Sequence, residues 1–600
     1  MSEANPEDKS ATEYSSQQIV EIVTAALARG IAAVEEGDID GAEQVFSGIL
    51  EIDSRNAEAL NGLGVIFSSR GDLDGAEKYF RRAVEIDGGN VNYQKNLGFI
   101  YAARGRSKRA VRALNEVVRL DPSDTDARYR LAWMHQARGE MAEFESGLRE
   151  VLEIDEQHAL ANNDLGCRLA QKGDAPAALE FLSKGAEADP DNPSILTNLG
   201  NTLLMVGDNG QARDTFAGAV DRQPDAIEAL KGLATAERLL GNLDAALIAA
   251  EKALAMAPQD ATAHNLVGTV LKEFGRYDDA LRHFNEARSL AEEFAPARAN
   301  ASMIRLLRGD WLGGFNEYEA RRFDPNLASP ANRTNRPQWD GSDLTGRAIL
   351  LLAEQGFGDT IQFCRFAPIL AGAAEKVVFE APPPLRRLLE TLAGGIEFVA
   401  PGDGLADVDV VAPLMSLPHF LDVGSETDID NGPYLRAGDP QPGAATLLEG
   451  IAGLRVGLNW RGSPSHKEDW KRSIDPDLLG PLLDLEGITF FGLNVDTDAA
   501  PPDGVVDLRA YIEDFADTAA IMAELDLVVS VDTSTVHLAG ALGRPCWAMI
   551  PHVPDWRWML DRDDTPWYAS VRLFRQNTIG DWSPVISEIQ AGIEQLRDGA

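Results

Sequence analysis

A glycine recurs at intervals of 34 residues through the first half of the chain. A fixed period of this length indicates an array of similar units, each too small to bury its apolar face alone. Glycine suits the left-handed residue that ends a helix, so the series also predicts where one helix of each unit stops. The pattern predicts an α-helical solenoid of about nine units. The glycines in register are Gly37, Gly71, Gly105, Gly139, Gly173, Gly207, Gly241, Gly275 and Gly309.

Small and aromatic residues repeat at other phases of the same period. They include Ala42 and Ala76, each followed four residues later by a phenylalanine, Phe46 or Phe80. This arrangement resembles the tetratricopeptide repeat, a pair of antiparallel helices joined by a tight turn. The resemblance implies an extended concave surface that binds another protein. We assign residues 19–328 to the solenoid, residues 1–18 to a disordered N-terminus and residues 329–345 to a linker.

Six asparagines keep the period and fall on the first helix of a unit. An asparagine side chain both donates and accepts hydrogen bonds, so a row of them can hold the backbone of an extended peptide. The alternative is that they are ordinary polar residues on a solvated helix face. The candidate peptide-binding residues are Asn61, Asn163 and Asn265 at one position of the unit, and Asn96, Asn198 and Asn300 at the next.

Composition narrows the class of partner. The formal net charge of −40 disfavours nucleic acids and anionic membranes, because their phosphates would be repelled. No uninterrupted apolar run approaches the ~20 residues of a membrane span, and the first residues lack the apolar core of a secretory signal. The three cysteines are scattered, which favours a reducing cytoplasm and no zinc site. We therefore expect a cytoplasmic protein with no metal cofactor, no membrane span and no nucleic-acid partner.

The second half has a different pattern, in which apolar runs of five or six residues alternate with helical stretches. Such alternation predicts parallel sheets covered by helices on both faces. We expect an α/β fold of two doubly wound lobes, residues 346–450 and 451–600, with ligands at the carboxyl ends of the strands. The predicted strands are Ala348–Ala353, Lys376–Glu380, Ile396–Ala400, Asp409–Ala412, Leu454–Trp460, Ile488–Leu493, Val505–Leu508, Leu525–Val531 and Cys546–Ile550.

Two predicted strand-to-helix turns contain the residues best suited to chemistry. The first has Gly356 and Gly358, which permit close approach of a ligand, and Asp359 at the start of a helix. The alternative for Asp359 is a simple helix cap. The second turn has hydroxyl and backbone N–H groups at a helix N-terminus, which suits an anion such as a diphosphate. Its residues are Asp532, Thr533, Ser534, Thr535 and His537, the last of which could instead be structural.

Cations gather after the first predicted strand of the second lobe, in a chain that is otherwise acidic. They suit the neutralisation of a phosphate at the carboxyl end of a parallel strand, although a solvated charged loop is the alternative. The candidate phosphate-binding residues in this segment are Arg461, His466, Lys467, Lys471 and Arg472.

The two turns together resemble the heptosyltransferase-like group of GT-B glycosyltransferases. Gly358-Asp359 matches the turn that opens the family's first lobe, and the stretch from Asp532 to Pro545 matches the pattern D-[ST]-G-x-x-H-L-A-x-A-L-G-x-P. Ser534 stands where the family usually has glycine. The resemblance implies that Asp359 is the base that deprotonates the acceptor hydroxyl. It further implies that the second turn holds the phosphate and sugar of the donor.

Repeats joined to a GT-B pair resemble protein O-glycosyltransferases, including the O-GlcNAc type and the bacterial enzymes that glycosylate flagellin. The resemblance implies an acceptor protein, with flagellin as one candidate, and a nucleotide-sugar co-substrate without a further cofactor. N-acetylglucosamine, heptose or a nonulosonic acid carried on CMP would each fit as the donor sugar. The alternative is a non-catalytic repeat scaffold whose second half is a degenerate glycosyltransferase.

Overall fold

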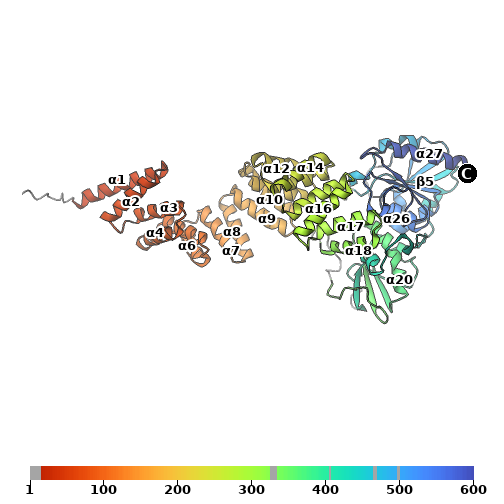
Figure 1. The fold of residues 1–600 in the computed structure, drawn as a ribbon, viewed down its shortest axis with the longest axis horizontal. Helices are drawn as coiled ribbons and strands as arrows, with labels where there is room; N and C mark the ends of the chain where they lie inside the picture. Colours follow the sequence, from red (N-terminus) through yellow and green to blue (C-terminus); the bar gives the residue numbers. More distant parts are fainter. Residues whose placement is uncertain (1–14, 324–333, 404–406, 464–468, 496–499, 600) are drawn as a thin grey trace, which may run out of the picture. The chain divides into compact units, whose positions relative to one another are not determined.

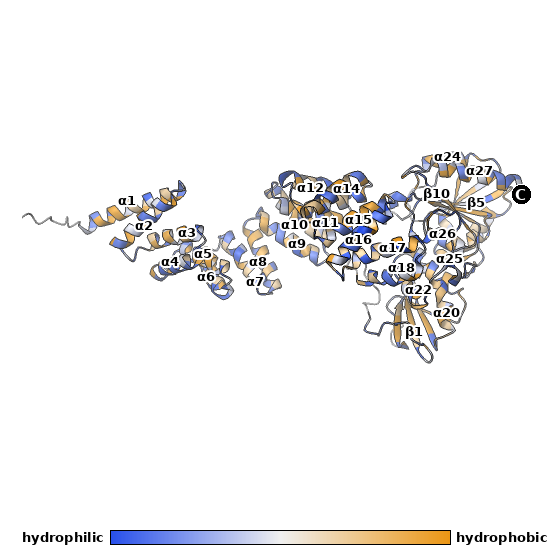
Figure 2. Cartoon of the chain, in the orientation of Figure 1, coloured by the Kyte–Doolittle hydropathy of each residue, from blue (hydrophilic) through white to orange (hydrophobic). Residues whose placement is uncertain are grey.

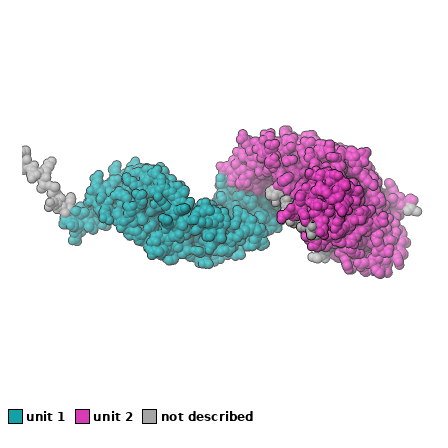
Figure 3. All heavy atoms as spheres, turned by 90° about the horizontal axis from the view of Figure 1, so that it is seen from below, with its two compact units in different colours: residues 1–223 teal, residues 224–600 magenta. Residues whose placement is uncertain are grey.

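The computed structural model describes residues 15–323, 334–403, 407–463, 469–495 and 500–599. The chain forms two compact units, residues 1–223 and 224–600 (Figure 3). The first unit contains helices α1 to α12, and the second contains helices α13 to α18 followed by two parallel sheets (Figure 1). An α-helical solenoid followed by an α/β region is the predicted fold class, which is confirmed. The boundary between the compact units falls inside the solenoid rather than at its end.

The solenoid helices follow one another in pairs of similar length. The helices of the first unit are α1 (Ser16–Glu35), α2 (Ile39–Ile52), α3 (Ala57–Ser69), α4 (Leu73–Ile86), α5 (Val91–Ala103), α6 (Ser107–Leu120), α7 (Thr125–Gln136), α8 (Met141–Ile154), α9 (Ala159–Gln171), α10 (Ala175–Ala188), α11 (Pro193–Val206) and α12 (Asn209–Arg222). Those of the second are α13 (Ile227–Leu239), α14 (Leu243–Met256), α15 (Ala261–Glu273), α16 (Tyr277–Leu290), α17 (Ala295–Leu307) and α18 (Trp311–Tyr318).

The glycines in register end the first helix of each pair, as predicted. All nine have positive φ, from 67° to 85°. This left-handed conformation is readily available to glycine and costs other residues energy. The next helix then starts on an aspartate in several pairs: Asp38 and Asp72 each accept a hydrogen bond from the backbone N–H three residues later, at 2.9 Å. Local sequence therefore sets both ends of the turn.

Helix α1 starts earlier than the predicted solenoid boundary. Ser15 caps it, and the Gln18 side chain accepts from the Ser15 N–H at 2.9 Å, which completes a capping box. Residues 16–18 are therefore helical, which corrects their assignment to a disordered N-terminus. Within the described part of the chain, α1 is the one helix long and apolar enough to cross a membrane, with a mean hydropathy of 1.3. Val23 and Ala26 nevertheless pack against α2 as in an ordinary repeat.

The first sheet has four parallel strands in the order β3-β2-β1-β4. They are β1 (Ala348–Leu352), β2 (Lys376–Glu380), β3 (Glu397–Val399) and β4 (Val410–Pro413). The helical segments between and after them are α19 (Phe357–Phe363), η3 (Cys364–Phe366), α20 (Ala367–Ala371), η4 (Pro383–Leu385), α21 (Arg386–Leu389), η6 (Leu414–Ser416) and α22 (Leu417–Phe420). Each strand was predicted to within one or two residues at either end. The apolar runs of β1, β2 and β4 are buried, whereas β3 is only partly buried. Figure 2 shows the predominantly apolar residues of this sheet around β1.

The second sheet has six parallel strands in the order β10-β9-β8-β5-β6-β7. They are β5 (Leu454–Asn459), β6 (Ile488–Gly492), β7 (Val505–Asp507), β8 (Leu527–Val531), β9 (Cys546–Ile550) and β10 (Val571–Arg575). The α-helices that accompany them are α23 (Pro442–Leu448), α24 (Gly480–Leu483), α25 (Phe515–Ala523), α26 (Ser534–Ala541) and α27 (Ser583–Gly599). Strand β10 and helix α27 were not predicted.

The last repeat packs directly on the second lobe. Trp311 of α18 stacks on Trp567 with ring centroids 5.2 Å apart, and Phe315 meets Trp556 edge-on at 5.7 Å. All four side chains are buried. The tryptophans after β9 are therefore core residues, and they join the last repeats to the α/β lobes within the second unit.

Candidate functional site

The two turns singled out by the sequence lie against each other in the second unit. Helix α19 follows β1 of the first lobe, and α26 follows β8 of the second. A Cβ atom on Gly358 would lie 2.8 Å from Cδ2 of His537 and 3.4 Å from Cα of Ser534. Glycine at position 358 is therefore needed for the close approach of the two lobes. The space beside this glycine is occupied by His537 rather than open to a ligand.

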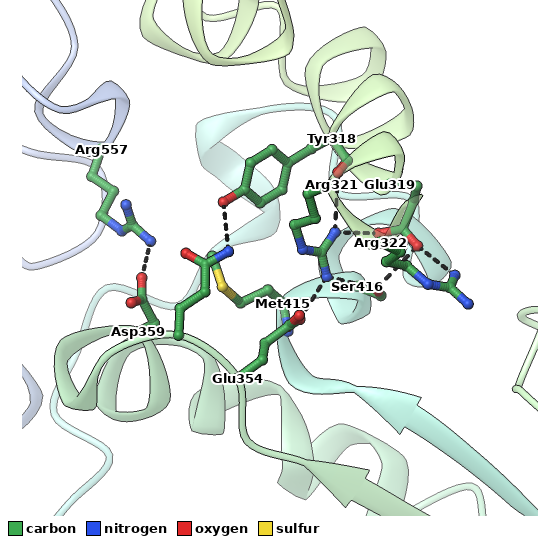
Figure 4. A network of polar contacts seen from close by, with 10 residues as sticks. Tyr318, Glu319, Arg321, Arg322, Glu354, Asp359, Met415, Ser416 and Arg557 are labelled. Atoms are coloured by element: carbon green, nitrogen blue, oxygen red, sulfur yellow. Dashed lines mark hydrogen bonds and ion pairs between the residues drawn. The ribbon is translucent and has the colours of Figure 1, made fainter. Parts of the chain in front are cut away.

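Asp359 has a partner on each carboxylate oxygen. Its Oδ2 accepts the Gly356 N–H at 2.8 Å, and its Oδ1 forms an ion pair with Arg557 of η11 (Trp556–Trp558; Figure 4). The helix-cap role is thus present, and it coexists with a contact to the other lobe. Each carboxylate oxygen can accept more than one hydrogen bond, so Asp359 keeps capacity to accept a further proton donor while both contacts are in place.

Arg557 is the cation that links the two lobes at this point. The residue is buried, and its guanidinium also contacts Asp555 at 2.9 Å and Gln362 Oε1 at 2.5 Å. The role of Arg557 was not predicted from the sequence. An arginine between two tryptophans soon after a strand was the available indication, because a cation within an apolar segment needs a partner when buried.

Asp532 ends β8 and has a different environment from Asp359. Burial, followed by the nearby Asp555 carboxylate, raises the pKa of Asp532 to about 6, while Arg472 and Arg557 act in the opposite direction. Among the described residues, no cation forms an ion pair with its carboxylate. A carboxylate with this pKa is well suited to accept a proton near neutral pH.

The hydroxyls of Thr533 and Thr535 are engaged inside the lobe. Asn459, at the end of β5, donates to Thr533 Oγ1 at 3.1 Å and to Thr535 Oγ1 at 2.6 Å. Asn494 in turn donates to Asn459 Oδ1 at 2.7 Å. Strands β5 and β8 are neighbours, so this buried network fixes the turn at the carboxyl edge of the sheet. Ser534 is only partly buried and lies next to Gly358.

His537 is a buried structural partner in this arrangement. Its Nδ1 lies 2.9 Å from the Tyr568 hydroxyl, and its ring stacks on Trp558 with centroids 5.4 Å apart. Burial, followed by Arg557 and Arg365, lowers the pKa of His537 well below its usual value. The imidazole is therefore neutral at pH 7, which suits a hydrogen-bonding role rather than charge neutralisation of a phosphate.

The residues of the predicted cationic segment make contacts in two different places, the β8–α26 turn and the solenoid. Arg472 donates to the carbonyl of Asp532 at 2.8 Å and to Asp469 at 3.0 Å, so it lies at the predicted site. Arg461, directly after Trp460, is partly buried, and no described carboxylate pairs with its guanidinium. Lys471 instead forms an ion pair with Glu273 of the solenoid. The predicted donor contacts His466 and Lys467 lie outside the described residues.

A second polar network ties the end of the solenoid to the first turn (Figure 4). Arg321 of η1 (Glu319–Phe323) bonds Glu354 at 2.6 Å, Glu319 at 2.7 Å and Ser416 at 2.9 Å. Gln355, which follows Glu354 in the β1–α19 turn, has a left-handed backbone with φ of 59°. Its side chain donates to the Tyr318 hydroxyl at 3.2 Å. The β1–α19 turn is therefore held from the solenoid side as well as from the second lobe.

The six asparagines form three pairs between neighbouring first helices. Asn96 donates to Asn61 at 2.9 Å, Asn198 to Asn163 at 2.8 Å and Asn300 to Asn265 at 3.1 Å. Each bond uses one donor and one acceptor and leaves further amide capacity. The pairs are compatible with contact to a peptide backbone, and they also stabilise the stacking of repeats. No group of three or more potential metal ligands occurs among the described residues.

Comparison with known proteins identifies the solenoid. Tetratricopeptide family models match residues 27–91, 93–217 and 197–261. The chain contains tetratricopeptide repeats. Such repeats are protein-binding modules, and the residues matched by the family models cover less than half of the chain.

Protein FlbA of Caulobacter vibrioides is 27% identical to this chain over 342 residues. The match covers 51% of this chain and 56% of that protein, so it spans little more than half of either. Among solved structures, PilF of Pseudomonas aeruginosa is 18% identical, covering 35% of this chain and 96% of that one, with a TM-score of 0.33. YrrB, a tetratricopeptide protein described as having an unusual peptide-binding site, is 23% identical, covering 31% and 95%, with a TM-score of 0.27.

Proposed function

We propose that this chain is a protein O-glycosyltransferase. The tetratricopeptide solenoid would bind the acceptor protein, and the α/β lobes would transfer a sugar from a nucleotide-sugar to a serine or threonine hydroxyl. The observation that supports this most is the contact between the two family-like turns at Gly358 and His537. Two segments about 180 residues apart that resemble one enzyme family would then form one site.

The residues at the strand ends suit the proposed reaction. The acceptor oxygen would form a bond to the anomeric carbon while the bond from that carbon to the phosphate oxygen breaks. The nucleotide would leave as an anion, next to Arg461 and Arg472 at the carboxyl end of the second sheet. The hydroxyl proton would pass to a carboxylate, for which Asp359 and Asp532 are the two candidates.

The resemblance to bacterial flagellin-modifying enzymes makes flagellin the first acceptor to test, with a CMP-linked nonulosonic acid as the first donor. The measurement is mass spectrometry of flagellin co-expressed with the full chain, compared with flagellin expressed alone. A sugar-sized mass increase on serine or threonine would support the proposal. Release of CMP from the donor that depends on added acceptor would separate catalysis from a scaffold role, because both functions predict acceptor binding.

A repeat scaffold without catalysis remains the second candidate. The observation that favours it is that both Asp359 oxygens already have partners, the Gly356 N–H and the Arg557 guanidinium, as expected for a helix cap and an ion pair between the lobes. The scaffold would bind the acceptor protein normally and release no nucleotide with any of the three donor sugars.

A further inference from the structure

One short segment of the second lobe touches the solenoid. In η8 (Asp469–Lys471), the Trp470 ring lies over Gly241, the left-handed glycine between α13 and α14. A Cβ atom on Gly241 would lie 3.1 and 3.2 Å from two atoms of this ring. A side chain at position 241 would therefore displace Trp470.

The next residue makes a charged contact with the same repeats. Lys471 forms an ion pair with Glu273 at the end of α15, and Arg238 of α13 contacts the same carboxylate at 3.0 Å. The Glu273 side chain is only 5% exposed. A carboxylate this buried depends on its cations, so the ion pair fixes Lys471 on the solenoid more firmly than a surface pair would.

The residue after that faces the predicted donor site. Arg472 donates to the carbonyl of Asp532 at 2.8 Å and to Asp469 at 3.0 Å. Ser473 accepts the Gly462 N–H at 3.0 Å and donates to Asp469. Three consecutive residues, Trp470, Lys471 and Arg472, thus contact the solenoid twice and the β8–α26 turn once.

We propose that Gly241 and Glu273 of the solenoid are positioning residues for the donor site, acting through the placement of Arg472. This inference rests on the proposed function for the identity of the ligand, but its structural part does not. Because only Trp470 and Lys471 lie between Asp469 and Arg472, little chain is available to absorb a displacement, and movement of Trp470 or Lys471 should shift Arg472. Loss of its contact would loosen the Asp532 turn and weaken the binding of a nucleotide phosphate.

The first experiment is hydrogen exchange on the full chain with Glu273→Gln, which keeps the side-chain shape and removes the charge. We expect exchange of the amides in residues 469–473 and 531–536 to rise about tenfold, while the α15–α16 hairpin stays protected. Unchanged exchange in residues 531–536 would overturn the inference. This readout does not depend on catalysis, so its failure differs from failure of the proposed function.

A matched pair of glycine variants tests the same step through Trp470. Gly241→Ala and Gly275→Ala both place alanine at a left-handed residue, with φ of 82° and 70°, but nothing lies within 4 Å of a Cβ on Gly275. Only Gly241→Ala should raise exchange in residues 531–536. Equal effects of both variants would assign the change to backbone strain and overturn the inference.

Titration calorimetry with CMP measures the consequence for the ligand. We expect Glu273→Gln and Gly241→Ala to weaken CMP binding about five- to tenfold, with Gly275→Ala unchanged. CMP affinity that is equal in all three variants and the unaltered chain would refute the positioning role. Absence of CMP binding by the unaltered chain would count against the proposed donor and leave the exchange experiment decisive.

Discussion

Replacing Arg321 with methionine tests how strongly the solenoid holds the β1–α19 turn. The Arg321 side chain is 2% exposed, and its partner Glu354 is 6% exposed. Methionine keeps an unbranched apolar side chain and removes the guanidinium, which leaves Glu354 and Glu319 buried near one another with fewer cations. Breaking one partner of a buried ion pair costs about 3–5 kcal/mol, because the remaining charge is uncompensated.

The pH dependence of the same contact follows from Glu319. Burial alone would raise the pKa of Glu319, but Arg321, then Arg322 and Ser416, outweigh burial and lower it below the usual value. A depressed carboxyl pKa stabilises the fold above the unfolded pKa of about 4.3, and that stabilisation is lost as pH falls through the folded value. In Arg321→Met this acid-labile contribution should shrink, because the main compensating cation is gone.

Native-state hydrogen exchange is the appropriate assay, because a chain with two compact units is not expected to unfold in one step. At about 1.4 kcal/mol per factor of ten, the predicted cost corresponds to roughly 10²–10⁴ faster exchange of the β1 amides. Arg308→Met is the matched control, since its partner Asp278 is 89% exposed and the pair should contribute little.

The double variant Arg321→Met/Glu354→Gln should exchange more slowly than Arg321→Met alone, because it no longer buries an unpaired Glu354 carboxylate. If Arg321→Met accelerates β1 exchange no more than Arg308→Met does, the reasoning about a desolvated ion pair is refuted.

Three further predictions follow from other parts of the molecule. If Asp532 is the base, Asp532→Asn should lower turnover by about 10²–10⁴ while both ligands still bind. The rate of the unaltered chain should then fall as pH drops through about 6, because the carboxylate becomes protonated. Normal turnover of Asp532→Asn together with a loss in Asp359→Asn would make Asp359 the base. Burial, then His264 and Arg282, lowers the pKa of His283. Neutral His283 therefore stabilises the fold above pH ~6.5, and that stability is lost as pH falls. His283→Gln should make the Tm depend less on pH between pH 7 and 5, and an unchanged dependence would show that His283 does not cause it. A fragment of residues 15–223 should fold and bind the acceptor in a pull-down, because it forms a compact unit. A fragment of residues 15–323 should aggregate in gel filtration, because Trp311 loses its contact with Trp567 and becomes exposed. A monodisperse 15–323 fragment would contradict this prediction.

The sequence determined the solenoid because its signals are local. A left-handed glycine every 34 residues, followed by a capping aspartate in several repeats, sets the helix ends through bonds between residues three apart. The buried strands of both sheets were also evident, because a strand covered on both faces needs an uninterrupted apolar run. Strand β10 was missed because Arg572 and Arg575 interrupt its apolar residues, so it lacks such a run.

Only the tertiary structure decided which polar groups meet. Arg557 reaches Asp359 across 198 positions of sequence, Asn459 engages Thr535 across 76, and Lys471 turns to Glu273 rather than toward the predicted donor site. The sequence predicted the turns that contain Asp359 and Thr535, but it contained no information on which residues would contact them. Those pairings depend on strand order and on the packing of lobes and repeats, where a buried charge must find compensation from whichever element lies within reach.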